Sequence, residues 1–186
     1  MDMKRIAVFL GSSEGSEQYM RSAYDLGHSL AEKGYGIVFG GAEVGTMKAF
    51  ADGVLDAGGS ITGVFPKGFG GKREVAATGR KIVNERLTEL IEVRDFAERK
   101  DVMNGLSDCC LILPGSFGTL DELFCLAVGN EIGLHDKRAF VANFNGYYDG
   151  LELQIKTMKR EHFLKESDDT VVFVHTVDEL FEALGR

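Results

Sequence analysis

Short apolar runs alternate along the chain with longer segments in which apolar residues recur every three or four positions. The short runs are typical of buried strands, and the longer segments have the spacing of amphipathic helices. We expect strands at 5–10, 36–39, 60–65, 87–93, 109–113, 138–143 and 170–174. We expect helices at 16–33, 46–57, 95–106, 120–132, 147–165 and 177–184.

This alternation predicts the fold class. Strands that alternate with helices favour an α/β fold, in which a doubly wound, Rossmann-like parallel sheet is covered on both faces as a three-layer α/β/α structure. The chain has 186 residues and no internal repeat or break in composition. We therefore expect residues 1–186 to form a single nucleotide-binding domain.

Three glycine-rich loops follow predicted strands, at 11–15, 40–46 and 114–119. Because right-handed crossovers bring all three to the carboxyl edge of the sheet, one ligand site can draw on all of them. A fourth segment, 66–84, is rich in Gly, Lys and Arg and has no period. We expect it to be an exposed loop that could close over a ligand as a lid.

Charge and cysteine content exclude several classes of function. The formal net charge is −8 and the pI is near 5.0, a balance that opposes binding to nucleic acid or to an anionic membrane. The three cysteines, Cys109, Cys110 and Cys125, form no CxxC pair, and the four histidines lack metal-ligand spacing. We expect no metal site and no disulfide. The apolar start is too short for a spanning helix and lacks the small-residue cleavage region of a signal peptide, so we expect a cytoplasmic protein.

The strongest local signal is the loop 114–119, Pro-Gly-Ser-Phe-Gly-Thr. Gly115 and Gly118 allow backbone N–H groups to approach an anion, and Ser116 and Thr119 add hydroxyl donors. The helix that follows directs the positive end of its dipole at the same point. The loop is neither a Walker A loop nor a GxGxxG fingerprint, but it predicts a phosphate cradle.

Glu122 has two interpretations. Thr119-x-x-Glu122 is the pattern of a capping box, in which Thr119 caps the helix and Glu122 binds back to the backbone. Glu122 could instead be a buried carboxylate beside the phosphate. The pattern leaves both roles open, and Ser12 is similarly either a ligand contact or ordinary turn chemistry.

The segment 94–103 combines a run of charges with helical spacing. Most such runs are solvated, salt-bridged helix faces. Here Phe96, Met103 and Leu106 define an inward stripe, and Arg99 and Lys100 fall between them on the same side. Inward charges need partners. No acidic cluster is evident opposite them, so a bound phosphate or ribose is the alternative partner.

Taken together, these segments resemble the LOG-type phosphoribohydrolases, the family also labelled "possible lysine decarboxylase". Residues 114–122 (PGSFGTLDE) are similar to the family motif PGGxGTxxE, 98–100 to its upstream Arg-Lys element, and 40–47 to its second glycine loop. The resemblance implies a Rossmann-like homodimer that uses no metal or organic cofactor. It also implies release of the free base from a nucleoside 5′-monophosphate, of the AMP or cytokinin riboside monophosphate type, leaving ribose 5-phosphate.

The resemblance also assigns residues. Arg99 and Glu122 would be the catalytic pair. Lys100, Ser116, Gly118 and Thr119 would hold the phosphoribosyl group, and Glu89 would be a further substrate contact. With the loop residues added, the expected substrate-binding set is Gly11, Ser12, Gly41, Thr46, Glu89, Lys100, Gly115, Ser116, Phe117, Gly118, Thr119 and Asp121.

The chain departs from the family pattern at Ser116 for the second Gly, at 96–97 (Phe-Ala) for Met-His, and at 128–129 (Val-Gly) for Thr-Trp. The first change affects the phosphate loop and the others affect the base pocket. The changes at Ser116 and at 96–97 support an alternative function, a non-enzymatic carrier of a nucleotide or of molybdenum cofactor. An amino-acid decarboxylase would need a Schiff-base lysine and pyridoxal phosphate, and Lys100 is the only well-placed lysine.

Overall fold

The computed structural model describes residues 4–67 and 83–185. The predicted loop 66–84, and with it the predicted lid, therefore falls mostly outside the described residues. The strands are β1 (Arg5–Phe9), β2 (Gly36–Phe39), β3 (Ile61–Pro66), β4 (Glu89–Val93), β5 (Cys109–Ile112), β6 (Ala139–Ala142) and β7 (Val171–Val174). The helices are α1 (Glu17–Glu32), α2 (Gly45–Asp56), α4 (Phe96–Gly105), α5 (Phe117–Glu131), α6 (Asp149–Arg160) and α7 (Val177–Leu184), with a 3₁₀ turn η1 (Phe144–Gly146).

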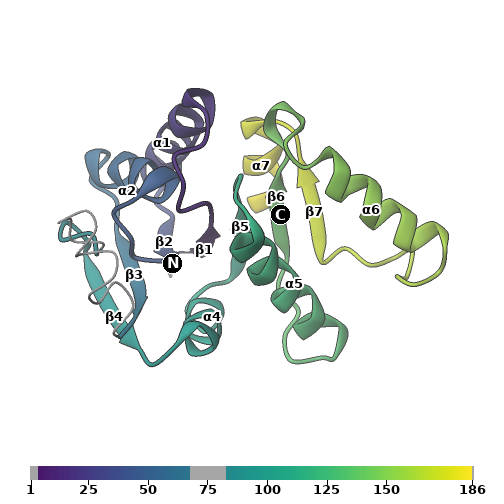
Figure 1. Ribbon diagram of the computed structural model, residues 1–186. Coiled ribbons are helices and arrows are strands. Elements are labelled where there is room, and N and C mark those ends of the chain that lie inside the picture. Colours follow the sequence, from purple (N-terminus) through teal and green to yellow (C-terminus); the bar gives the residue numbers. More distant parts are fainter. Residues whose placement is uncertain (1–3, 68–82, 186) are drawn as a thin grey trace.

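The seven strands form one parallel sheet in the order β4-β3-β2-β1-β5-β6-β7. Successive residues of a strand face opposite sides, so the apolar runs supply two cores. Ile6 and Val8 of β1 pack in the core that contains α1, α2 and α7. Ala7 and Phe9 pack in the core that contains residues of α4 and α5. Figure 1 shows helices on both faces of the sheet, which confirms the predicted three-layer α/β/α fold.

Two predicted helix boundaries are wrong. α5 begins at Phe117, three residues before the predicted start, because Ser116 is the N-cap residue and Gly118 is accommodated in the first turn. α6 ends at Arg160, before the predicted end at 165. It stops there because His162 adopts a left-handed φ of 63° and the N–H of Phe163 bonds back to Met158, which closes the helix as a glycine often does.

The strand order reverses between β1 and β5, which lie side by side at the centre of the sheet. Crevices at such reversal points, beyond the carboxyl ends of the strands, are where doubly wound folds bind ligands. The loops after these strands touch: the N–H of Gly11 donates to the carbonyl of Pro114 at 3.1 Å. Within 4–67 and 83–185, no helix has the length and apolar content needed to cross a bilayer.

Candidate active site

A cavity of about 500 Å³ opens at this reversal point. One side is polar and consists of the loop after β1 and the first turns of α5. The other side is apolar and comes from the ends of β2 and β3 and the start of α2. The residues that line the whole cavity are Leu10, Gly11, Ser12, Ser13, Gly40, Ala42, Val44, Met47, Phe65, Pro66, Phe96, Arg99, Ser116, Gly118, Thr119 and Glu122.

The two glycines of the predicted cradle serve different purposes. A Cβ on Gly115 would overlap Thr119 and come within 2.9 Å of the Gly11 nitrogen, so only glycine fits between these loops. A Cβ on Gly118 would meet nothing within 4 Å, and Gly118 lines the cavity. Gly118 therefore keeps space open beside the N–H groups of the first turn of α5, which have no acceptors within the helix.

The capping-box interpretation of Glu122 is wrong. The N-cap of α5 is Ser116, so Thr119 lies inside the helix. Glu122 does not reach back to the helix start, because its Oε1 accepts a hydrogen bond from Nη1 of Arg99 at 3.1 Å. Among the described residues, the Ser116 hydroxyl makes no capping hydrogen bond, and Ser116 lines the cavity.

Arg99 and Glu122 form a buried ion pair that lines the cavity. Each residue is only 7% exposed, and α4 and α5 contribute one partner each. Nε of Arg99 also donates to the carbonyl of Val64 at 3.1 Å. The guanidinium fits because Gly40 has no side chain: a Cβ there would overlap Nη2 of Arg99.

Burial perturbs both members of the pair. Desolvation raises the pKa of Glu122 to about 7, against the opposing effect of the Arg99 guanidinium. The same desolvation lowers the pKa of Arg99, and the Glu122 carboxylate partly offsets it. A carboxyl group that titrates near neutral pH in a cleft is suited to acid–base or charge-stabilising chemistry.

Lys100 and Asp121 form a second ion pair between the same helices, at 2.7 Å. Neither residue lines the cavity. The prediction that no acidic groups oppose Arg99 and Lys100 is therefore wrong, since α5 supplies one carboxylate to each. Phe96 was expected on the buried stripe, but it lines the cavity and is 47% exposed. The centre of its ring lies 5.8 Å from the guanidinium carbon of Arg99.

Several other predicted site residues lie outside the cavity lining. Thr46 is buried behind it and donates to the carbonyl of Gly11 at 2.6 Å, while Gly41 accepts from the N–H of Asn84 at 3.0 Å. Both support the loops rather than face the cavity. Phe117 is 90% exposed on the outer side of α5.

Glu89 is not brought to the cavity. It begins β4 and pairs with Thr62, whereas the cavity lies at the other end of these strands, where Pro66 pairs with Val93. The Glu89 carboxylate accepts a hydrogen bond from Thr62 at 3.3 Å. The expected substrate contact at Glu89 therefore has no support from the geometry.

Sequence reasoning missed most of the apolar side of the cavity. Its residues are Leu10, Ala42, Val44, Met47, Phe65 and Pro66. Those at strand ends have the composition of core residues, so only their position at the carboxyl edge could have distinguished them.

Comparisons with known proteins show which family the chain resembles. A family model described as possible lysine decarboxylase matches residues 47–185. The cytokinin riboside 5′-monophosphate phosphoribohydrolase LOG5 of Arabidopsis thaliana is 36% identical over 88% of this chain and 69% of its own length. The cytokinin riboside 5′-monophosphate phosphoribohydrolase of Rhodococcoides fascians is 35% identical over 92% of this chain and 83% of its own length.

Solved structures share the fold at lower identity. The molybdenum cofactor binding protein of Rippkaea orientalis superposes with a TM-score of 0.71 at 20% identity, covering 100% of this chain and 97% of that one. The molybdenum cofactor carrier protein of Chlamydomonas reinhardtii gives 0.69 at 19% identity, covering 98% and 96%. At this identity the likeness concerns the fold.

Proposed function

The chain belongs to the LOG family of phosphoribohydrolases, and on that premise we propose that it hydrolyses the N-glycosidic bond of a nucleoside 5′-monophosphate. The substrate is of the AMP or cytokinin riboside monophosphate type, and the products are the free base and ribose 5-phosphate. The observation that carries the proposal is the buried Arg99–Glu122 pair in a cavity that also contains the start of α5.

The two sides of the cavity suit the two ends of such a substrate. The first turn of α5 offers N–H groups that have no acceptor within the helix, together with a positive dipole end, and Ser116 and Gly118 line the cavity beside it. This side suits the 5′-phosphate. Phe65, Pro66 and Phe96 provide apolar surface on the other side, which suits a planar base. The glycosidic bond would then lie between them, near Glu122.

The chemistry follows from this placement. As the C1′–N bond breaks, its electron pair leaves with the base, which takes up a proton, and positive charge develops on the ribosyl ring until water adds at C1′. The Glu122 carboxylate stabilises that charge or accepts a proton from the attacking water. Arg99 holds Glu122 in place and partly neutralises the substrate. Binding energy from the distant phosphate orients the reacting carbon.

The direct test is to incubate the protein with a panel of nucleoside monophosphates, including AMP and a cytokinin riboside monophosphate. Free base and ribose 5-phosphate are measured together by chromatography, beside Glu122→Gln. Equal release of both products by the wild type, lost in a folded variant, is the expected result. Tight nucleotide binding without release of base would instead support the carrier function. Turnover by Glu122→Gln close to that of the wild type would contradict the role of Glu122.

We also propose that the protein acts as a homodimer through the outer face of α5. Phe117, Phe124, Val128 and Ile132 recur along that face, and each is exposed, Phe117 by 90%. A second copy of the chain fits this surface, because an apolar stripe along one helix can pair with itself about a twofold axis. Light scattering should give twice the chain mass, and Val128→Glu should shift the protein to monomer.

The remaining proposals concern domain organisation, cellular compartment and binding partners. We propose that residues 1–186 act as one domain in the cytoplasm, without nucleic-acid or membrane partners. Cys109 and Cys110 are buried free thiols and Cys125 is an exposed one, a state typical of a reducing compartment. The net charge of −8 opposes binding to polyanions. Fractionation of cells and a filter-binding assay with nucleic acid would test these points.

A further inference from the structure

Each backbone carbonyl from Leu113 to Gly115, at the start of the predicted phosphate-binding loop, accepts a hydrogen bond. The carbonyl of Leu113 accepts from the Tyr148 hydroxyl at 2.8 Å, and that of Gly115 accepts from the Tyr147 hydroxyl at 2.7 Å. Between them, the carbonyl of Pro114 accepts from the N–H of Gly11. Two consecutive tyrosines therefore hold the loop on either side of Pro114. Neither tyrosine lines the cavity.

The geometry of the peptide bond gives these contacts a consequence at the cavity. In a trans peptide the carbonyl and the following N–H point in opposite directions, so the Gly115 carbonyl and the Ser116 N–H move as one unit. Gly115 rotates more easily than any residue with a side chain. Tyr147, which does not line the cavity, binds the Gly115 carbonyl at one end of this peptide, and Ser116, whose N–H lies at the other end, lines the cavity.

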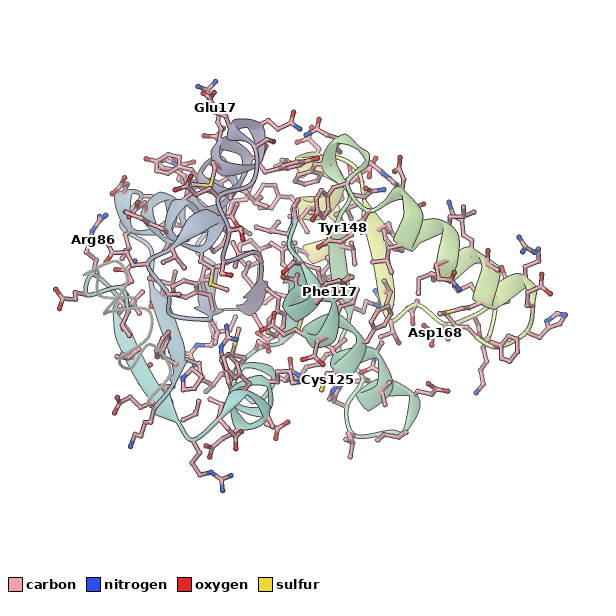
Figure 2. All side chains as sticks on the ribbon, in the orientation of Figure 1. Glu17, Arg86, Phe117, Cys125, Tyr148 and Asp168 are labelled. Carbon is pink, nitrogen blue, oxygen red and sulfur yellow. The ribbon has the colours of Figure 1, made fainter. Side chains whose placement is uncertain are left out.

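The tyrosines are themselves firmly placed. Asn143, which is 2% exposed at the end of β6, accepts from the N–H of Tyr148 at 2.7 Å. The rings of Tyr147 and Tyr148 meet edge to face at 4.8 Å, and Tyr19 of α1 contacts the Tyr147 ring edge to face at 5.3 Å. Burial raises the pKa of Tyr148, so its hydroxyl remains a donor. Tyr148 is labelled in Figure 2.

We propose that Tyr147 and Tyr148 are positioning residues for the phosphate-binding loop, with Tyr147 fixing the Gly115–Ser116 peptide so that its N–H binds the anion. The inference rests on the proposed function for the identity of the anion, the 5′-phosphate of the substrate. It assigns to two residues outside the cavity a part in phosphate affinity rather than in cleavage of the glycosidic bond.

Tyr147→Phe tests this assignment because it removes the hydroxyl and keeps the ring contacts with Tyr19 and Tyr148. We expect KM for the nucleotide to rise about three- to tenfold, the effect of one lost hydrogen bond. The inhibition constants of ribose 5-phosphate and inorganic phosphate should rise by the same factor, while kcat stays within about twofold because the loop grips the phosphate throughout the reaction. Inhibition by the unphosphorylated nucleoside should not change.

Tyr24→Phe is the matched control, since the Tyr24 hydroxyl donates to Asp56 at 3.1 Å and Tyr24 does not line the cavity. It should leave every constant at the wild-type value. The proposal is wrong if Tyr147→Phe retains wild-type affinity for phosphate. It is equally wrong if the nucleoside loses as much affinity as the phosphates, because that would indicate general disruption of the cavity.

A binding measurement tests this inference independently of the proposed reaction. If the wild type releases no base, the proposed reaction is wrong. The calorimetric Kd of ribose 5-phosphate still tests the tyrosines, and Tyr147→Phe should weaken it about three- to tenfold. Tyr148→Phe should weaken it at least as much, because Leu113 is buried and its carbonyl would lose its donor.

Discussion

Two ion pairs join α4 to α5, and their members are neighbours in the sequence. Arg99–Glu122 and Lys100–Asp121 have donor–acceptor distances of 3.1 and 2.7 Å. Their surroundings differ more than their distances. The side chains of the first pair are 9% and 8% exposed, whereas Asp121 in the second is 64% exposed. A shift of one position along each helix turns the side chain toward another face. The first pair therefore faces the cavity and the second faces solvent.

We therefore expect the shorter contact to contribute less to stability. In water an ion pair gains little, because both charges are already well solvated and the side chains lose freedom. In the interior each charge has lost most of its hydration, so its stabilisation depends on the opposite charge of its partner. The comparison indicates that burial, rather than distance, distinguishes the Glu122 carboxylate from that of Asp121.

Arg99→Met should produce the largest change in stability. Met fills similar volume but leaves the buried Glu122 carboxylate without its partner, so we expect the free energy of unfolding to fall by about 3–5 kcal/mol at pH 8. The loss should shrink at pH 5.5, where Glu122 is protonated. Urea denaturation at both pH values measures it. Lys100→Met should lose far less, and equal losses for the two variants would contradict the comparison.

Glu122→Gln should produce the largest change in rate that leaves the fold intact. Gln keeps the size of the side chain and an oxygen for Arg99, but it cannot carry negative charge. We expect kcat to fall about 100- to 1000-fold, as when a preorganised electrostatic group is removed. Glu131→Gln, at the far end of α5 and exposed, is the control and should match the wild type. A similar loss in both variants would mean that the effect is not specific to the cavity.

The pH profile of the reaction should report the titration of Glu122. Because burial raises the pKa of Glu122 to about 7, its ionised form is present above that pH and is lost as the pH falls. We expect kcat/KM to fall about tenfold for each pH unit below 7. For stability the sign is opposite: the folded state holds the proton more tightly than the unfolded chain, so this group destabilises the fold as pH rises from about 4.5 to 7.

The measurement is kcat/KM for the wild type and Glu122→Gln between pH 5 and 9. The residual activity of Glu122→Gln should lack the limb near pH 7. If that limb persists in the variant, another group is responsible for it.

The fold was predictable because each strand and helix is encoded locally. Apolar runs and glycine-punctuated helices gave all seven strands and the six helices within 4–67 and 83–185. The errors arose at the ends of helices, where the conformation of a single residue determines the boundary. The N-cap at Ser116 and the left-handed φ of His162 carry no periodic signal.

The site was predictable only in part, because pairing across distant segments is not visible in the spacing. Arg99 and Glu122 were each singled out, yet the partner of Arg99 lies 23 residues away on another helix. The motif-based assignment of Glu89 failed for the opposite reason. Glu89 lies at the amino end of β4, away from the cavity, and the predicted strand at 87–93 already places it nearer that end than the carboxyl edge where ligands bind.

The smallest expected effect concerns the exposed pair, and it sharpens the comparison most directly. A double-mutant cycle with Lys100→Met and Asp121→Asn should give a coupling energy below about 1 kcal/mol in the free energy of unfolding, because solvent screens the exposed Asp121 carboxylate. Raising the salt concentration from about 0.05 to 1 M should reduce it further. The same cycle with Arg99→Met and Glu122→Gln should give a larger coupling that salt changes little. A salt-insensitive coupling at Lys100–Asp121, equal to that of the buried pair, would show that exposure does not distinguish them.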